Sequence, residues 1–326
     1  MIDILIPDFI EQYDLSRPPS RSNPGGGLGV KYARVEEVLS RRYKVRRVSS
    51  LEAVRSDFVI VEPLWFEWGE VGWEKRWGDF LGHAFDRVLV FGSDQTLFRC
   101  PQYLREGILQ NVDWVTHNCD YQRNMFAVGG IYDSLFLCDP VPEHVFYPAQ
   151  KARRVYASGQ ISSEKRTGDL IELFGYLQGS SIETCYIGSA STWGDKENPF
   201  AVANRAQLAR ELEAVTDVFL GNVSQAEAAF WSNSSLFHMH VAQYDCSCQN
   251  QQEAALSGAV LWGLTHPINA ERPVQQFSCV ASCAEAIERM DAESVQRCSA
   301  DIVEVARSLW SYEAFDAQFH RIIRGG

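Results

Sequence analysis

Residues 245–260 read DCSCQNQQEAALSGAV, and this stretch says most about the fold of the chain. Its two acids, Asp245 and Glu253, stand on either side of seven residues, and a short helix, a glycine and an apolar strand follow. The spacing predicts Asp245 on a loop after a strand and Glu253 on the first turn of a helix whose amino end faces the same crevice. Backbone amides at such an end attract a diphosphate. Carboxylates beside them accept hydrogen bonds from sugar hydroxyls. The plainer alternative is that Glu253 only complements the helix dipole.

Composition indicates an ordinary globular protein. With 326 residues, 46% of them hydrophobic, the chain has enough apolar content for two cores of roughly 150 residues each. Its apolar runs fall short of the roughly 20 residues that span a bilayer, and the opening MIDILIPD predicts a first strand rather than a signal peptide. We therefore expect a cytoplasmic protein with no membrane span. Nine cysteines, an odd number, suggest reduced thiols.

Short apolar runs alternate with helix-length polar patterns along the whole chain. Such alternation predicts an α/β protein with two doubly wound, Rossmann-like domains that face a shared cleft with the carboxyl ends of their strands. A connection with several prolines at 138–148 predicts the boundary between the domains. Helical patterns continue from Ala292 to about Ile323. Strands are predicted at 2–6, 43–48, 58–61, 87–91, 114–117 and 135–138, and again at 154–158, 183–187, 218–220, 236–238 and 259–262.

The second half resembles the donor domain of GT-B glycosyltransferases, in particular the retaining class called family 4. The segment YASGQISSEKR at 156–166 resembles the class's opening strand, glycine, cationic loop and helix. CYIGS at 185–189 and FLGNVSQAE at 219–227 resemble the next two motifs in the same order. The acids Asp245 and Glu253 resemble the paired-acid motif that closes the series.

The first half resembles the acceptor domain of the same fold. A glycine-rich loop, PGGGLG at 24–29, follows the first strand, and Gly26 and Gly27 permit close approach of the backbone to a phosphate or a sugar. The plainer alternative for this loop is a flexible surface connection. The resemblance implies an acceptor-binding domain at 1–148, a nucleotide-sugar donor domain at 149–305, and a C-terminal helix at 306–326 that braces the first domain.

The resemblance also implies an activity. It implies that the protein transfers a hexose from a nucleotide-diphosphate sugar to a hydroxyl acceptor, with retention at the anomeric carbon. Glucose is the expected sugar and UDP the expected nucleotide. Stabilising the departing diphosphate is the main catalytic task. Lys165 matches the phosphate-binding lysine of the class, with Arg166 beside it, while Glu253 would hold the ribose and Asp245 the transferred sugar. The remaining donor-binding residues implied are Gly159, Gly188, Val223, Cys246, Ser247, Cys248 and Gln249.

Two positions depart from the class. Asp245 replaces the commoner glutamate with a shorter but chemically equivalent acid. Gln160 stands where an arginine is usual, which removes a fixed positive charge from the phosphate site. The alternative to an enzyme is therefore a partner subunit or binding protein that kept the fold and lost the transfer activity. It would bind a nucleotide sugar without transferring the sugar.

Metal-independent chemistry without a cofactor is expected. The chain contains no Asp-x-Asp pair, the usual means of holding a divalent cation against a diphosphate. A zinc site built from His238, His240, Cys246 and Cys248 is geometrically conceivable, because the two histidines would point to one face of a strand. Their spacing matches no common zinc motif, so we expect no metal.

Acceptor-side candidates follow strands of the first half. Asp94 could accept the proton of an incoming hydroxyl, although a turn residue is the alternative. His117 ends another predicted strand, with a satisfied core histidine as its alternative. Trp65 and Trp68 could stack on a sugar or a base, or could belong to the core.

The identity of the acceptor stays open at the level of sequence. The chain is short for the retaining class, and compact GT-B enzymes include phage enzymes that glucosylate hydroxymethylated pyrimidines in DNA. Modified DNA is therefore the alternative acceptor, with aromatic side chains available to receive an extruded base. The formal charge of −12 and the pI of about 5.1 provide no overall attraction for nucleic acid.

Overall fold

The computed structural model describes residues 1–20, 22–24, 26–67, 73–92, 107, 110–190, 198–242, 248–265 and 273–325. The chain forms two compact units. Unit 1 comprises Met1–Asp14, Asn23–Pro140 and Tyr312–Gly326, and unit 2 comprises Leu15–Ser22 and Val141–Ser311. Apart from Leu15–Ser22, the chain leaves unit 1 after Pro140, inside the proline-containing connection at 138–148, and returns to it at Tyr312. The resemblance implies changes at 148/149 and 305/306.

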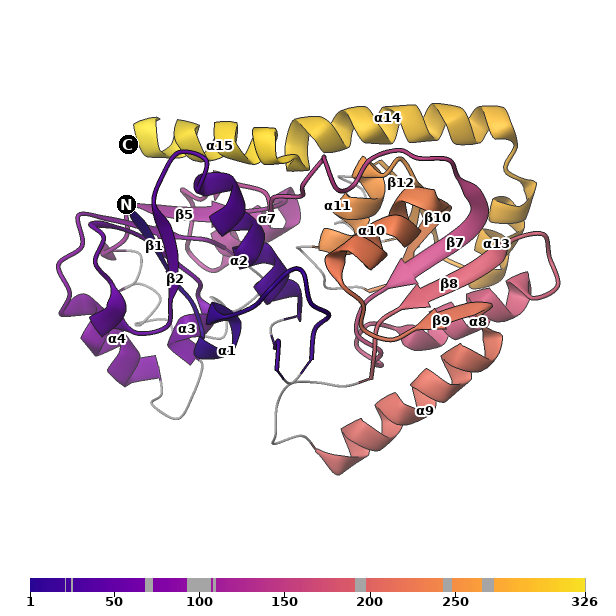
Figure 1. Cartoon of the computed structure of the whole chain (residues 1–326), viewed down its shortest axis with the longest axis horizontal. Helices are drawn as coiled ribbons and strands as arrows, with labels where there is room; N and C mark the ends of the chain where they lie inside the picture. Colours follow the sequence, from indigo (N-terminus) through magenta and orange to yellow (C-terminus); the bar gives the residue numbers. More distant parts are fainter. Residues whose placement is uncertain are drawn as a thin grey trace. The chain divides into compact units, whose positions relative to one another are not determined.

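Unit 1 is built on a six-stranded sheet with the order β2-β1-β3-β4-β5-β6, in which every neighbouring pair is parallel. Helices connect most of the successive strands (Figure 1). The strands are β1 (Ile2–Leu5), β2 (Val45–Val48), β3 (Phe58–Val61), β4 (Arg87–Val90), β5 (Trp114–His117) and β6 (Leu135–Phe136). The described helices are α1 (Asp8–Glu11), α2 (Gly26–Leu39), the 3-10 turn Leu51–Ala53, α3 (Leu64–Glu67), α4 (Trp73–Leu81), α7 (Asp120–Val128) and α15 (Tyr312–Gly325).

Unit 2 repeats this architecture with the strand order β12-β11-β10-β7-β8-β9, again parallel throughout. The strands are β7 (Ala152–Ser158), β8 (Glu183–Ile187), β9 (Val218–Leu220), β10 (Ser235–His240), β11 (Val260–Leu264) and β12 (Val274–Phe277). The helices are α8 (Thr167–Leu177), α9 (Pro199–Val215), α10 (Gln225–Ser234), α11 (Gln249–Leu256), α13 (Val280–Arg289) and α14 (Ala292–Trp310).

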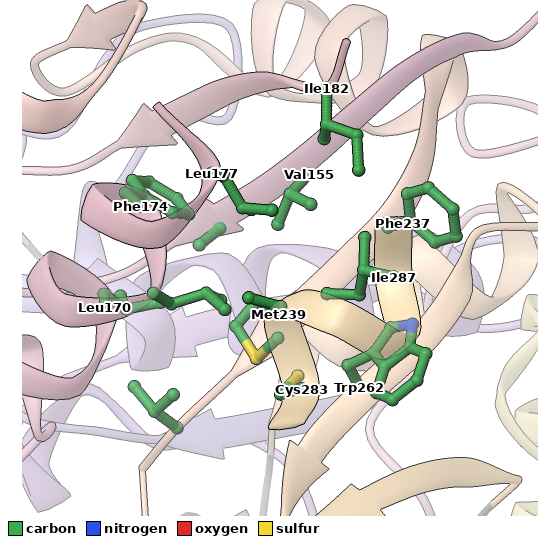
Figure 2. Packing of buried hydrophobic residues seen from close by; sticks show 14 of the residues in the cluster. Val155, Leu170, Phe174, Leu177, Ile182, Phe237, Met239, Trp262, Cys283 and Ile287 are labelled. Atoms are coloured by element: carbon green, nitrogen blue, oxygen red, sulfur yellow. The ribbon is translucent and has the colours of Figure 1, made fainter. Parts of the chain in front are cut away.

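Side chains along the strands of unit 2 point alternately to the two faces of its sheet, and both faces are buried. On one face Val155, Phe237 and Trp262 pack with residues of α8 and α13 in a single hydrophobic cluster (Figure 2). Burying each large apolar side chain stabilises the fold by about 1.5–3 kcal/mol. On the other face Tyr156 and Cys185 pack with residues such as Trp231 of α10. Successive residues point to opposite faces, so the polar residues among these strands are held in fixed directions.

The structure confirms the fold class expected from the sequence, with two parallel α/β sheets and a strand at every predicted position. Strand β12 was not predicted. Its sequence, VQQF, has only two apolar residues and lies at the edge of the sheet. The C-terminal helical pattern is interrupted at Ser311, where the backbone is extended and where Val141 donates a hydrogen bond to Trp310 O at 2.8 Å.

Among the residues described, no helix combines the length and the apolar character that a membrane crossing requires.

Candidate functional site

Two glycines leave the carboxyl ends of β7 and β8 free of side chains. Gly159 and Gly188 have φ angles of +146° and +149°, in the region that favours glycine. Gly159 N–H donates to Ile187 O at 3.0 Å, and a Cβ on Gly188 would lie 1.8 Å from Gly159 O. No side chain fits at Gly188 without moving the backbone. The two turns pack backbone against backbone at the carboxyl edge of the sheet, where parallel α/β sheets bind their ligands.

Two side chains fix this pair of turns. The Tyr186 hydroxyl donates to Gly159 O at 2.9 Å, and Asn250 Nδ2 donates to Ser158 O at 2.9 Å. Burial raises the pKa of Tyr186, so its hydroxyl stays protonated and remains a donor. Since Asn250 lies in the first turn of α11, the amino end of that helix is attached directly to the end of β7.

The cationic loop before α8 has a defined internal structure. Thr167 Oγ1 accepts from Ser162 N–H and donates to Ser162 O, each at 3.0 Å, and Lys165 N–H donates to Ser162 Oγ at 3.2 Å. Arg166 has a φ of 54° and forms an ion pair of 2.6 Å with Asp169. The loop thus holds two cations at the amino end of α8, an arrangement that suits an anionic ligand.

Glu253 lies in the second turn of α11, which corrects the sequence prediction of the first turn. The helix begins at Gln249, four residues earlier, with Cys248 as its N-cap. The Glu253 side chain is buried, and its charge helps to raise the pKa of Tyr156 on β7, for which burial is the larger cause. An acid, a cationic loop and the two glycine turns therefore all belong to the carboxyl edge of one sheet.

Two histidines and a cysteine lie next to this region. His240 Nδ1 is 3.1 Å from Cys248 Sγ. His238 is fully buried, and neither ring nitrogen has a hydrogen-bond partner among the described residues. Burial, and then the nearby His240, lower the pKa of His238 to about 3, so the ring is neutral. The described residues include no group of three histidines, cysteines or acids that could hold a metal ion.

His117 ends β5 in unit 1 and is almost completely buried. Its Nδ1 is 2.9 Å from Ser134 Oγ, and its ring lies edge-on to Phe136 with centroids 6.0 Å apart. Burial is the largest cause that lowers the pKa of His117, which favours the neutral ring. The next residue, Asn118, was not selected from the sequence. It is 3% exposed, and neither side-chain amide atom has a partner in the described part of the chain.

The other predicted residues occupy varied positions. Gly26 begins α2 with a φ of 47°, and a Cβ on Gly27 would meet nothing within 4 Å. Val223 packs at the margin of the cluster that contains Tyr156 and Cys185. Trp65 is 4% exposed, and its Nε1 donates to Ser49 O at 2.8 Å. Trp65 therefore belongs to the core, which was the alternative to stacking on a sugar or a base.

The structure groups the predicted residues by unit. Asp94, Asp245, Cys246, Ser247 and Trp68 lie outside the described residues. The other residues predicted to bind the donor divide between the units. Gly26 and Gly27 belong to unit 1, and the rest belong to unit 2, namely Gly159, Lys165, Arg166, Gly188, Val223, Cys248, Gln249 and Glu253. Trp65 and His117 also belong to unit 1.

Comparison with known proteins identifies the fold. No family model and no curated protein matches the sequence. Among solved structures, sucrose-phosphate synthase from Thermosynechococcus elongatus aligns over 99% of this chain and 98% of its own, with a TM-score of 0.75 and 12% identity. HepE of Anabaena, solved with UDP-glucose, aligns over 100% and 99% with a TM-score of 0.67 and 11% identity. The trehalose-6-phosphate synthase OtsA aligns over 90% and 76% with a TM-score of 0.62 and 11% identity. The chain therefore has the GT-B fold.

Proposed function

We propose that this protein is a glycosyltransferase that moves a hexose from a nucleotide-diphosphate sugar to a hydroxyl acceptor. UDP-glucose is the donor proposed. The proposal rests on the groups gathered near the carboxyl edge of the sheet in unit 2. They are the two glycine turns, the Lys165–Arg166 loop and the buried Glu253. Two structures of similar fold, HepE solved with UDP-glucose and TarM of S. aureus solved with UDP, support the choice of donor.

The proposed chemistry assigns separate tasks to these groups. Negative charge develops on the diphosphate as the sugar leaves, and fixed cations nearby stabilise it. Arg166 also pairs with Asp169, and in this proposal Lys165 and Arg166 together supply the compensating charge. Glu253 accepts hydrogen bonds from the ribose hydroxyls and Asp245 from the hydroxyls of the transferred sugar. In this proposal transfer proceeds with retention, and no metal takes part.

Thermal unfolding with nucleotide sugars tests donor binding. A ligand that binds only the folded state stabilises it by about 2.7 kcal/mol at one hundred times its Kd. We expect UDP-glucose to raise Tm most in a panel that includes ADP-, GDP- and dTDP-glucose. Glu253→Gln and Lys165→Ala should lose most of that increase, and Glu211→Gln on the exposed face of α9 should keep it. An unchanged Tm across the whole panel with the wild-type protein would refute the proposed function.

A transfer assay then distinguishes an enzyme from a binding protein. UDP release and anomeric configuration would be measured with glycans, small alcohols and hydroxymethylated DNA as acceptors, with and without EDTA. Transfer with retention that survives EDTA is expected. Strong salt dependence on DNA would identify modified DNA as the acceptor. Saturable binding without transfer to any acceptor would identify a non-catalytic binder instead.

A further inference from the structure

Asn233, near the end of α10, is the centre of a polar junction at the carboxyl end of α11. The side chain is 7% exposed. Its Oδ1 accepts from Ser257 Oγ at 2.7 Å and from Tyr147 N–H at 3.1 Å, while Nδ2 donates to Val145 O at 2.9 Å. An amide oxygen has two lone pairs, so its accepting capacity is fully used. One side chain thereby joins α10, the C-cap of α11 and the segment 145–147.

The same junction satisfies the carbonyls of the two residues that follow α11. Ser257, its C-cap, has a fully buried side chain, and its carbonyl oxygen accepts a hydrogen bond from Lys151 Nζ. The next carbonyl, of Gly258, accepts from Ser299 Oγ of α14 at 2.7 Å. Because Ser257 Oγ donates its hydrogen to Asn233, Ser232 is the donor in the 3.0 Å contact between the two serine hydroxyls. The helix end is therefore held from three sides.

α11 depends on such attachment. A helix of eight residues is about 12 Å long and is not stable alone in water. Gln251 and Gln252 are 0% and 1% exposed, so α11 buries polar side chains along with Ala254 and Ala255. Hydrogen bonds at its ends add to the packing that fixes its position. Ser257 N–H donates to Glu253 O at 2.9 Å, so the junction lies one helical turn from the acid proposed to bind the ribose.

We propose that Asn233 is a positioning residue for the donor site: through Ser257 it holds α11 where Glu253 meets the nucleotide. This inference rests on the proposed function. Asn233 acts through the helix, at the end opposite the glycine turns, and is not assigned any contact with the substrate. Its loss should therefore weaken donor binding while the chemical step in the bound complex is largely preserved.

Enzyme kinetics and hydrogen exchange on the full-length protein test the positioning role. We expect Asn233→Ala to raise the Kd for UDP and the KM for UDP-glucose about tenfold, with kcat per folded molecule changed less than twofold. Ser257→Ala is a milder variant and should also raise the Kd for UDP and the KM for UDP-glucose. Without any ligand, the amides of 249–256 should exchange faster in both variants.

A matched control removes a different buried hydrogen bond from the same unit. Thr184 Oγ1 donates to Asp217 Oδ2 at 2.9 Å between β8 and β9. Thr184→Val should lower stability without a selective rise in KM or faster exchange in α11. In Asn233→Asp, the new carboxyl can donate to Val145 O only when protonated. UDP affinity relative to wild type should therefore recover as pH falls.

Two results separate this inference from the proposed function. Unchanged exchange of 249–256 in Asn233→Ala would overturn the positioning role whether or not a donor is known. If the wild type binds UDP and Asn233→Ala binds it with equal affinity, the positioning role is overturned as well. If the wild type binds no nucleotide sugar, the proposed function and the donor-binding part of the inference are both overturned. If the amides of 249–256 nevertheless exchange faster in Asn233→Ala, the role of Asn233 in attaching α11 still stands.

Discussion

At the scale of single residues, Gly188 carries the most direct structural constraint. Its φ is +149°, and a Cβ added to it would lie 1.8 Å from Gly159 O, so Gly188→Ala must displace the backbone of both turns. We expect a loss of about 3 kcal/mol or more in the free energy of unfolding. Urea denaturation measures this loss. Gly175→Ala, inside α8 with open space around its Cβ, should be neutral or stabilising by up to about 1 kcal/mol. Equal stability of both variants would contradict the geometry.

His238 should make stability depend on acid pH. Its folded-state pKa of about 3 lies below the ordinary value of 6.5, so between these values the unfolded chain binds a proton that the folded chain does not. Stability should therefore fall as pH drops from about 6.5 towards 3, by up to about 1.4 kcal/mol per pH unit from this group. His238→Phe should lessen that slope in urea denaturation between pH 4 and pH 8. Parallel curves for variant and wild type would show that His238 is not buried in the neutral form.

At the scale of elements, the sequence predicted most strands because their apolar runs are short and end in glycine or polar residues. It missed β12, in which Gln275 and Gln276 occupy the centre of an edge strand. It also placed the start of α11 too late. The N-cap of this helix, Cys248, makes no side-chain capping hydrogen bond, and Gln249 and Gln251 are buried through tertiary contacts that local sequence does not reveal.

The attachment of β8 to the turn after β7 gives a prediction at the element scale. Tyr186→Phe removes the hydroxyl that donates to Gly159 O and leaves that carbonyl without this partner. We expect a loss of about 1–2 kcal/mol in the free energy of unfolding and weaker UDP binding, because the turn proposed to face the diphosphate loosens. Tyr176→Phe, at an exposed position of α8, is the matched control. Calorimetric titration with UDP would check the affinity; identical affinities for the two variants would argue against the role of Tyr186.

At the scale of the whole molecule, the sequence predicted two α/β domains because each half has its own series of strands. The resemblance implied that the C-terminal helix goes with the first domain, but no sequence pattern indicated a second exchange between the units. Leu15–Ser22 groups with unit 2, although both flanking segments belong to unit 1. The return to unit 1 falls at Tyr312, whose buried hydroxyl donates to Glu37 of α2 at 2.8 Å. That contact joins residues 275 positions apart in the sequence, and no local pattern encodes it.

In the proposed function, the carboxyl edge of the sheet in unit 2 binds the nucleotide diphosphate. Hydrogen exchange of the whole protein with and without saturating UDP-glucose tests this location. We predict protection concentrated in 156–166, 185–189 and 248–256, and its loss in Glu253→Gln at the same ligand concentration. Protection confined to unit 1 would contradict binding at this edge, and the same protection in wild type and Glu253→Gln would contradict the role of Glu253.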